Sequence, residues 1–102
     1  MTAITELMDE FGTSYRQLDY WIRQGYIHTL PNERAGSGYS RQLSEDEIQI
    51  ARYMIRLIKA GFVVGTAALI ARRFVLEGTR ETLLPEGIVV KIRKRYATSK
   101  DL

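Results

Sequence analysis

Apolar residues near the N-terminus recur at positions i, i+3, i+4 and i+7, the spacing of one face of a helix. This set is Ile4, Leu7, Met8 and Phe11. Gly12 is a helix terminator, so the pattern predicts a short first helix that ends there. Ser14 can cap a second helix at once, and Gln17, three residues later, can complete a capping box. The two predicted helices are therefore joined by a tight turn.

The second predicted helix, residues 14–24, is amphipathic and is followed by Gly25, which suits a helix stop. Its apolar face consists of Tyr15, Leu18, Trp21 and Ile22. Its polar face consists of Arg16, Gln17, Tyr20, Arg23 and Gln24. Two short helices around a tight turn, the second with a polar outer face, are typical of a helix-turn-helix.

Periodicity disappears over residues 28–43 and returns in two further helices. Ser44 with Glu47 forms a second capping box, which predicts a third helix that stops at Gly61. A fourth helix is predicted over residues 65–77. Beyond Gly78, a Pro-Glu-Gly turn precedes alternating apolar residues that predict one strand over residues 87–93.

The stretch "RAGSGYSRQL" contains two glycines between Arg34 and Arg41. It matches no phosphate-binding loop, because it contains neither G-x-x-x-x-G-K-[ST] nor G-x-G-x-x-G after an apolar strand. Glycine permits the positive φ angles of a tight turn, so a β-hairpin over residues 28–43 is the better interpretation. A hairpin after a helix-turn-helix is a wing, and its polar residues Arg34, Ser37, Tyr39 and Arg41 are candidate contacts.

Composition limits the classes of function. The 102 residues, 45% of them hydrophobic, suit one modest core, and the net charge of +3 permits a nucleic acid as partner. Absence of cysteine excludes disulfides and thiolate metal sites, and no segment resembles a membrane span or leader, which predicts a cytoplasmic protein. The only histidine, His28, has no plausible catalytic or metal partner, so we expect no enzyme, no cofactor and no metal.

The segments "SYRQLDYWIRQGYI", "RAGSGYSRQLSEDEI" and "IRLIKAGF" resemble, in that order, the recognition helix, wing and third-helix end of MerR-like winged helix-turn-helix proteins. The likeness covers about residues 1–77. Asp19 replaces an arginine that members often have, and Leu43 replaces a tyrosine. Classical members continue into a long dimerisation helix and an effector domain. This chain ends soon after the fourth predicted helix, so the resemblance implies DNA binding but no small-molecule effector.

The resemblance implies a mostly α-helical winged helix-turn-helix domain over residues 1–78, with four helices, a wing and a basic extension over 79–102. Arg16 and Gln17 would read bases in the major groove, and Ser14, Tyr15, Tyr20 and Arg23 would contact the DNA backbone. Arg34 and Arg41 would reach the backbone or minor groove. The alternative for these side chains is an ordinary solvated helix face and surface loop.

Two further groups of residues are open to two interpretations each. The basic residues of the tail either contact DNA or keep the chain end soluble; they are Lys91, Arg93, Lys94 and Arg95. A set of apolar residues near the C-terminus belongs either to the core or to a subunit interface; they are Phe74, Val75, Leu76 and Val90. Trp21 shares a face with Leu18, which favours a core position over a stacking platform.

Three functions compete. The first is a bacterial or phage transcription regulator that binds double-stranded DNA in the nucleoid as a homodimer or head-to-tail multimer. The second is an excisionase-type recombination directionality factor, which loads on tandem sites and bends DNA. The third is a protein-interaction module without DNA binding, which would use helix four and "GIVVKI".

Overall fold

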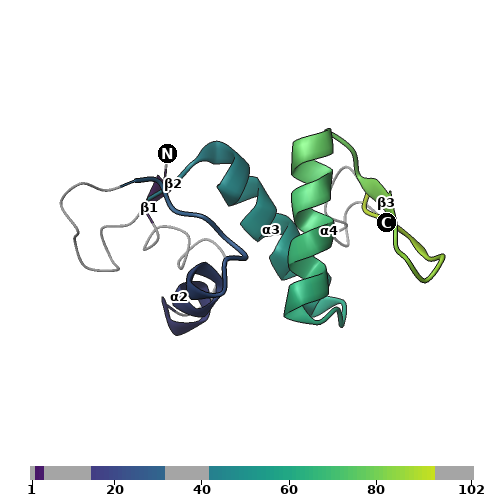
Figure 1. Ribbon diagram of the computed structural model, residues 1–102, viewed down its shortest axis with the longest axis horizontal. Helices are drawn as coiled ribbons and strands as arrows, with labels where there is room; N and C mark the ends of the chain where they lie inside the picture. Colours follow the sequence, from purple (N-terminus) through teal and green to yellow (C-terminus); the bar gives the residue numbers. More distant parts are fainter. Residues whose placement is uncertain (1, 4–14, 32–41, 94–102) are drawn as a thin grey trace, which may run out of the picture.

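Three helices and two small antiparallel sheets make up the computed structural model of the chain, which describes residues 2–3, 15–31 and 42–93. Helices α3 (Glu45–Lys59) and α4 (Val64–Glu77) pack against each other at the centre of the molecule (Figure 1). Helix α2 (Tyr15–Arg23) lies on the α3 side, and the β3–β4 hairpin lies beyond α4. A mostly helical fold is thus confirmed, with three helices in the described part; the predicted first helix lies outside it.

Helix α2 has the predicted amphipathic form. Leu18 and Trp21 are almost completely buried, and Ile22 packs against the same core. The helix ends where Gly25 adopts a φ of +80°, a conformation that costs glycine nothing. Immediately after it, the backbone N–H of Tyr26 donates to the carbonyl of Trp21 at 2.9 Å, which closes the last turn. The predicted stop is therefore confirmed.

Helix α3 begins at the predicted cap, but only half of the capping box forms. The Ser44 hydroxyl accepts a 3.3 Å hydrogen bond from the Glu47 backbone N–H. The Glu47 carboxylate, expected to turn back to the helix start, instead points away from it to other elements. Helix α4 ends at Gly78, whose φ of +64° provides the left-handed C-cap.

A two-stranded sheet joins the N-terminus to the predicted wing segment. Strand β1 (Thr2–Ala3) pairs antiparallel with β2 (Gln42–Leu43), in the register Thr2↔Leu43. The Gln42 carbonyl also accepts a 2.8 Å hydrogen bond from the Leu30 backbone N–H. The two ends of the segment between Leu30 and Gln42 are therefore held together, as a hairpin requires.

The C-terminal strand prediction was correct in type but incomplete. Strand β4 (Val89–Lys91) does not stand alone but pairs antiparallel with β3 (Glu81–Leu83), which the sequence pattern missed. Beyond the strands, the Leu84 N–H donates to the Ile88 carbonyl at 2.8 Å, which leaves the three-residue loop Pro85-Glu86-Gly87, closed by a 2.9 Å bond from the Gly87 N–H to the Leu84 carbonyl. Gly87 has a φ of +84°, as a three-residue hairpin loop requires.

One hydrophobic core joins all three helices to both sheets. It contains Trp21 from α2, Leu43 from β2, Val90 from β4, and the facing sides of α3 and α4. The hairpin therefore packs on the same core as the helices. None of the described helices is long and apolar enough to cross a membrane.

Candidate functional site

The solvent face of α2 presents four of the predicted contact residues together. Arg16, Gln17, Tyr20 and Arg23 are all exposed, while Leu18 and Trp21 on the opposite face are buried. Tyr20 is 48% exposed although its neighbour Trp21 is 2% exposed, so the two adjacent aromatic residues have opposite environments. Because the apolar face is fixed in the core, the polar face has a fixed orientation toward solvent.

An ion pair within α2 involves the residue that departs from the family pattern. Asp19 Oδ2 lies 2.8 Å from Arg23 Nε, one helical turn away. Asp19 is largely buried and the Arg23 side chain is 76% exposed. The contact uses Nε, and the two terminal nitrogens of a guanidinium remain geometrically able to donate to a phosphate. Asp19 therefore orients Arg23 while partly offsetting its charge.

Other predicted contacts lie at or beyond the limits of the described residues. Ser14, Arg34, Ser37, Tyr39, Arg41, Lys94 and Arg95 lie outside them. Tyr15 begins α2. Lys91 and Arg93 are exposed at the C-terminal end of the hairpin, on the other side of α4 from α2 (Figure 1). The structure thus brings together the α2 residues and separates Lys91 and Arg93 from them.

The predicted subunit interface is divided by the fold. Phe74 and Val90 are buried in the core of their own chain, so they are not available on the surface for a partner. Val75 is half-buried, and only Leu76 is well exposed. The alternation in β4 explains this outcome, because Val90 faces the core while its two neighbours face solvent.

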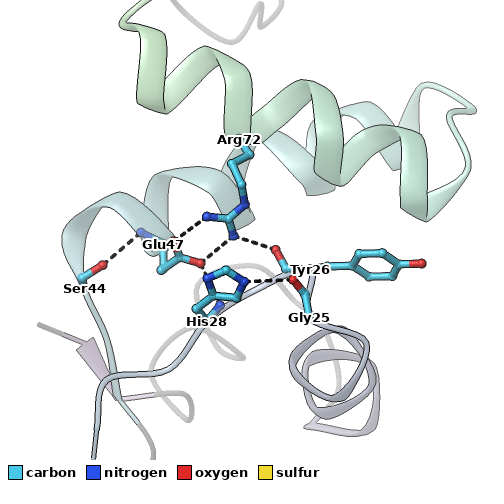
Figure 2. A network of polar contacts seen from close by, with 6 residues as sticks. All are labelled: Gly25, Tyr26, His28, Ser44, Glu47 and Arg72. Atoms are coloured by element: carbon cyan, nitrogen blue, oxygen red, sulfur yellow. Dashed lines mark hydrogen bonds and ion pairs between the residues drawn. The ribbon is translucent and has the colours of Figure 1, made fainter.

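A partly buried ion pair, not predicted from the sequence, links α3 to α4 beside the chain that leaves α2 (Figure 2). The Arg72 guanidinium of α4 donates to both carboxylate oxygens of Glu47 on α3, at 2.9 Å to Oε2 and 2.8 Å to Oε1. Glu47 is 8% exposed, which makes this a paired, nearly buried charge. Two parallel hydrogen bonds are the geometry in which arginine holds a carboxylate most firmly.

The same pair also binds the backbone that leaves α2. Arg72 donates a second bond from Nη2 to the Tyr26 carbonyl at 2.9 Å, and Glu47 Oε1 accepts from the His28 backbone N–H at 2.7 Å. The His28 ring is close by, with Nε2 donating to the Gly25 carbonyl at 3.1 Å. Figure 2 shows Arg72 extending from α4 to reach both Glu47 and the chain after α2. We call Glu47, Arg72 and these backbone groups the Glu47–Arg72 clasp.

The clasp connects α3, α4 and the chain that follows α2, and these connections hold α2 in its position. It joins α3 and α4 to the segment between the end of α2 and Leu30. A sequence signal for it exists in part: Arg72 follows the buried Ala71, and Arg72 and Arg73 are the two charged residues of the stretch 62–76. Its partner could not be identified by spacing, because 25 residues separate Arg72 from Glu47.

The environment of Glu47 determines the direction of its pKa. Burial alone would raise the pKa of this carboxyl, but hydrogen bonds from Arg72 and the His28 N–H, together with the positive charge of Arg72, outweigh burial. The net result is a pKa below the ordinary value of glutamate. The folded state therefore favours the carboxylate form.

This direction predicts an acid-dependent loss of stability. A carboxyl whose pKa is lowered by folding stabilises the protein fully above its unfolded pKa, about 4.3, and loses that contribution as pH falls through the folded value. A Glu47→Gln variant lacks this contribution at every pH. We expect the stability difference between wild type and variant, measured by urea unfolding, to shrink below about pH 4.3. A difference that stays constant to about pH 3 would contradict the assignment.

The chain matches a known protein family. A family model described as MerR HTH family regulatory protein matches residues 2–73, well over half of the chain. No curated protein and no solved structure gives a significant match. The matched region includes α2, the β1–β2 sheet and α3, and it ends within α4, before the β3–β4 hairpin.

Proposed function

Because the chain belongs to the MerR HTH family of regulatory proteins, we propose that it is a sequence-specific regulator of transcription that reads DNA with the exposed face of α2. Family membership indicates a DNA-binding transcription regulator. The observation that supports α2 as the reading element is its clean division into a buried apolar face and an exposed face with Arg16, Gln17, Tyr20 and Arg23.

In this proposal α2 lies in the major groove with its N-terminal end toward the bases. Arg16 and Gln17 are near that end, where arginine can bridge the two acceptors of guanine and glutamine can bridge adenine. Each such pair discriminates against the wrong base by about 1 to 3 kcal/mol. These two residues are the proposed base readers.

Tyr20 and Arg23 are farther along the same face and are the proposed contacts to phosphate, with Ser14 and Tyr15 at the helix start. The Asp19–Arg23 ion pair supports this role, because it holds the guanidinium in one direction before DNA arrives. A pre-oriented side chain loses less conformational entropy on binding than a freely rotating one.

The segment 28–43 is the proposed wing, with Arg34 and Arg41 reaching the DNA backbone or minor groove. Two anchors at its ends support the proposal: the His28 N–H is bound by Glu47, and the Leu30 N–H is bound by Gln42. The clasp that fixes the start of the wing also fixes the end of α2. The two proposed contact elements therefore share one support.

The regulator proposed here acts by binding rather than by catalysis, in the cytoplasm of a bacterium or a phage-infected cell. One module of this size contacts few base pairs, so binding as a homodimer or a head-to-tail multimer is part of the proposal. An excisionase that loads on tandem sites and bends DNA remains an alternative with the same α2 contacts.

The test is selection from a random pool of double-stranded DNA, followed by sequencing, for wild type and an Arg16→Ala/Arg41→Ala variant. We expect wild type to enrich a motif that the variant loses. An inverted repeat would favour the repressor type of regulator, and regularly spaced direct repeats would favour the excisionase. Wild-type protein that binds without enrichment, and identically to the variant, would contradict the proposal. An Arg80→Ala variant is the matched control, because Arg80 is exposed and lies between α4 and β3, outside α2 and the proposed wing.

A further inference from the structure

The β3–β4 hairpin has one face in the core and one apolar face in solvent. Val90 is buried, and Thr82 accepts a hydrogen bond from Arg73 of α4, so these residues define the inner face. Leu83 and Val89 belong to the outer face, where they are 62% and 59% exposed. These two apolar side chains lie side by side on one sheet face, and such a contiguous exposed apolar face is a candidate contact surface.

The strand register determines how the outer face is arranged. Leu83 is paired with Val89, and Glu81 is paired with Lys91, so an apolar pair lies next to a pair of opposite charges. Among the described residues, neither Glu81 nor Lys91 forms an ion pair through its side chain. The outer face thus carries one apolar pair and, two residues farther along the strands, one acidic residue directly opposite one basic residue.

This arrangement is complementary to itself. If a second hairpin is rotated by 180° about an axis parallel to the strands, its β3 lies over the first β4 and its β4 over the first β3. Leu83 of each copy then faces Val89 of the other, and Glu81 of each copy faces Lys91 of the other. Both charge contacts are attractive, and sheets pack face to face in this way with their strands nearly aligned.

We infer that the outer face of the β3–β4 hairpin is a contact surface for a second copy of this chain. A two-fold contact uses the same patch on both copies, which is the property that the register provides. The patch is small compared with the roughly 1,200 Å² that stable interfaces bury, so the pair is weak in free solution. Adjacent binding sites on DNA would strengthen it by raising the effective concentration.

The role of this contact on DNA rests on the proposed function, whereas the contact itself does not. The hairpin lies on the other side of α4 from α2 (Figure 1), so pairing through it leaves both α2 faces open. A two-fold pair would place two reading helices on an inverted repeat rather than on direct repeats. The inference therefore favours the repressor type of regulator over the excisionase.

The first test needs no DNA. Self-association of the full chain is measured by sedimentation equilibrium up to about 1 mM, for wild type and a Leu83→Thr/Val89→Thr variant that keeps strand-forming residues. We expect the variant to associate more weakly by about tenfold or more, because it loses the apolar contact. Val63→Thr is the matched control, since Val63 is at least as exposed as Leu83 and Val89 but precedes α4 at the end remote from the hairpin.

The second test separates contacts between copies from contacts within one chain. Glu81→Lys gives a face with two positive charges, and Lys91→Glu gives a face with two negative charges. Each variant alone should associate more weakly than wild type, and an equimolar mixture should form a mixed pair more tightly than either variant forms its own. Repulsion within each hairpin cannot produce this recovery, because it is present in the mixture as well.

Two results would overturn the inference. If the wild-type chain stays monomeric at the highest concentration, the outer face does not bind a second copy and would have to bind a different protein. If a dimer forms but neither set of variants weakens it, the contact between copies lies elsewhere on the chain. On DNA, Leu83→Thr/Val89→Thr should lose cooperative binding to two sites and keep wild-type affinity for one site. Failure to bind even one site would instead count against the proposed function, and the sedimentation result would still decide the inference.

Discussion

An Arg72→Met variant should be less stable than wild type by about 3 kcal/mol. The substitution keeps most of the side-chain volume but removes both hydrogen bonds to Glu47 and the bond to the Tyr26 carbonyl. Glu47 would remain a nearly buried charge without its partner, and an unpaired buried charge costs more than the pair contributes. Urea unfolding measures the loss, which is a large part of the 5 to 15 kcal/mol typical of a domain.

Two companion variants test the reason for this loss. Arg73→Met removes a neighbouring guanidinium whose contacts to Thr82 and Leu83 are long, at 3.4 Å, and we expect it to cost less than about 1 kcal/mol. Adding Glu47→Gln to Arg72→Met removes the stranded charge, so the double variant should be more stable than Arg72→Met alone. A double variant that is less stable by the sum of both losses would contradict the clasp.

Replacing Trp21 with alanine should cost about 3 to 5 kcal/mol, whereas replacing its neighbour Tyr20 should change stability by less than about 1 kcal/mol. The reason is burial: Trp21 fills the core beneath α2, and Tyr20 is half exposed on the opposite side. Trp21 is the only tryptophan, so the Trp21→Ala variant has no tryptophan fluorescence. Unfolding of both variants is therefore followed by circular dichroism. Tyr20→Ala should instead weaken DNA binding, because Tyr20 is a proposed phosphate contact.

The pair of variants also separates structure from recognition. If Trp21→Ala weakens DNA binding only in proportion to the fraction of unfolded protein, Trp21 acts through the fold. A Tyr20→Ala variant that is less stable than Trp21→Ala would show that the two faces of α2 are assigned the wrong way round. Equal losses of stability at both positions would contradict the assignment of Trp21 alone to the core.

Sequence patterns predicted those elements whose determinants are close together in the chain. The spacing of Leu18 and Trp21 identified the buried face of α2, and Ser44 and Gly78 identified the ends of α3 and α4. Each of these signals acts within one or two helical turns. The exposed α2 face followed from the same periodicity, so its residues were placed on one surface correctly.

Features that depend on distant parts of the chain were not predictable in this way. Strand β3 has only three residues, too few to show an alternating pattern, and it exists because β4 pairs with it. The sequence predicted Val90 to be either a core residue or an interface residue, because its spacing fits a strand but does not show which face of the strand is buried. Glu47 fits a capping box locally, yet its carboxylate binds Arg72, because a guanidinium that donates to both carboxylate oxygens is a stronger partner than one backbone N–H at a helix N-terminus.

If the exposed face of α2 reads DNA sequence, Arg16 and Gln17 control the ratio of the affinity for a specific site to the affinity for unrelated DNA. Binding is titrated at one fixed salt concentration on the selected site and on a scrambled duplex, for wild type, Arg16→Ala/Gln17→Ala and the Arg80→Ala control. We expect the ratio to fall about tenfold or more in the α2 variant, while affinity for the scrambled duplex changes much less. An α2 variant that keeps the wild-type ratio would show that α2 does not read the sequence.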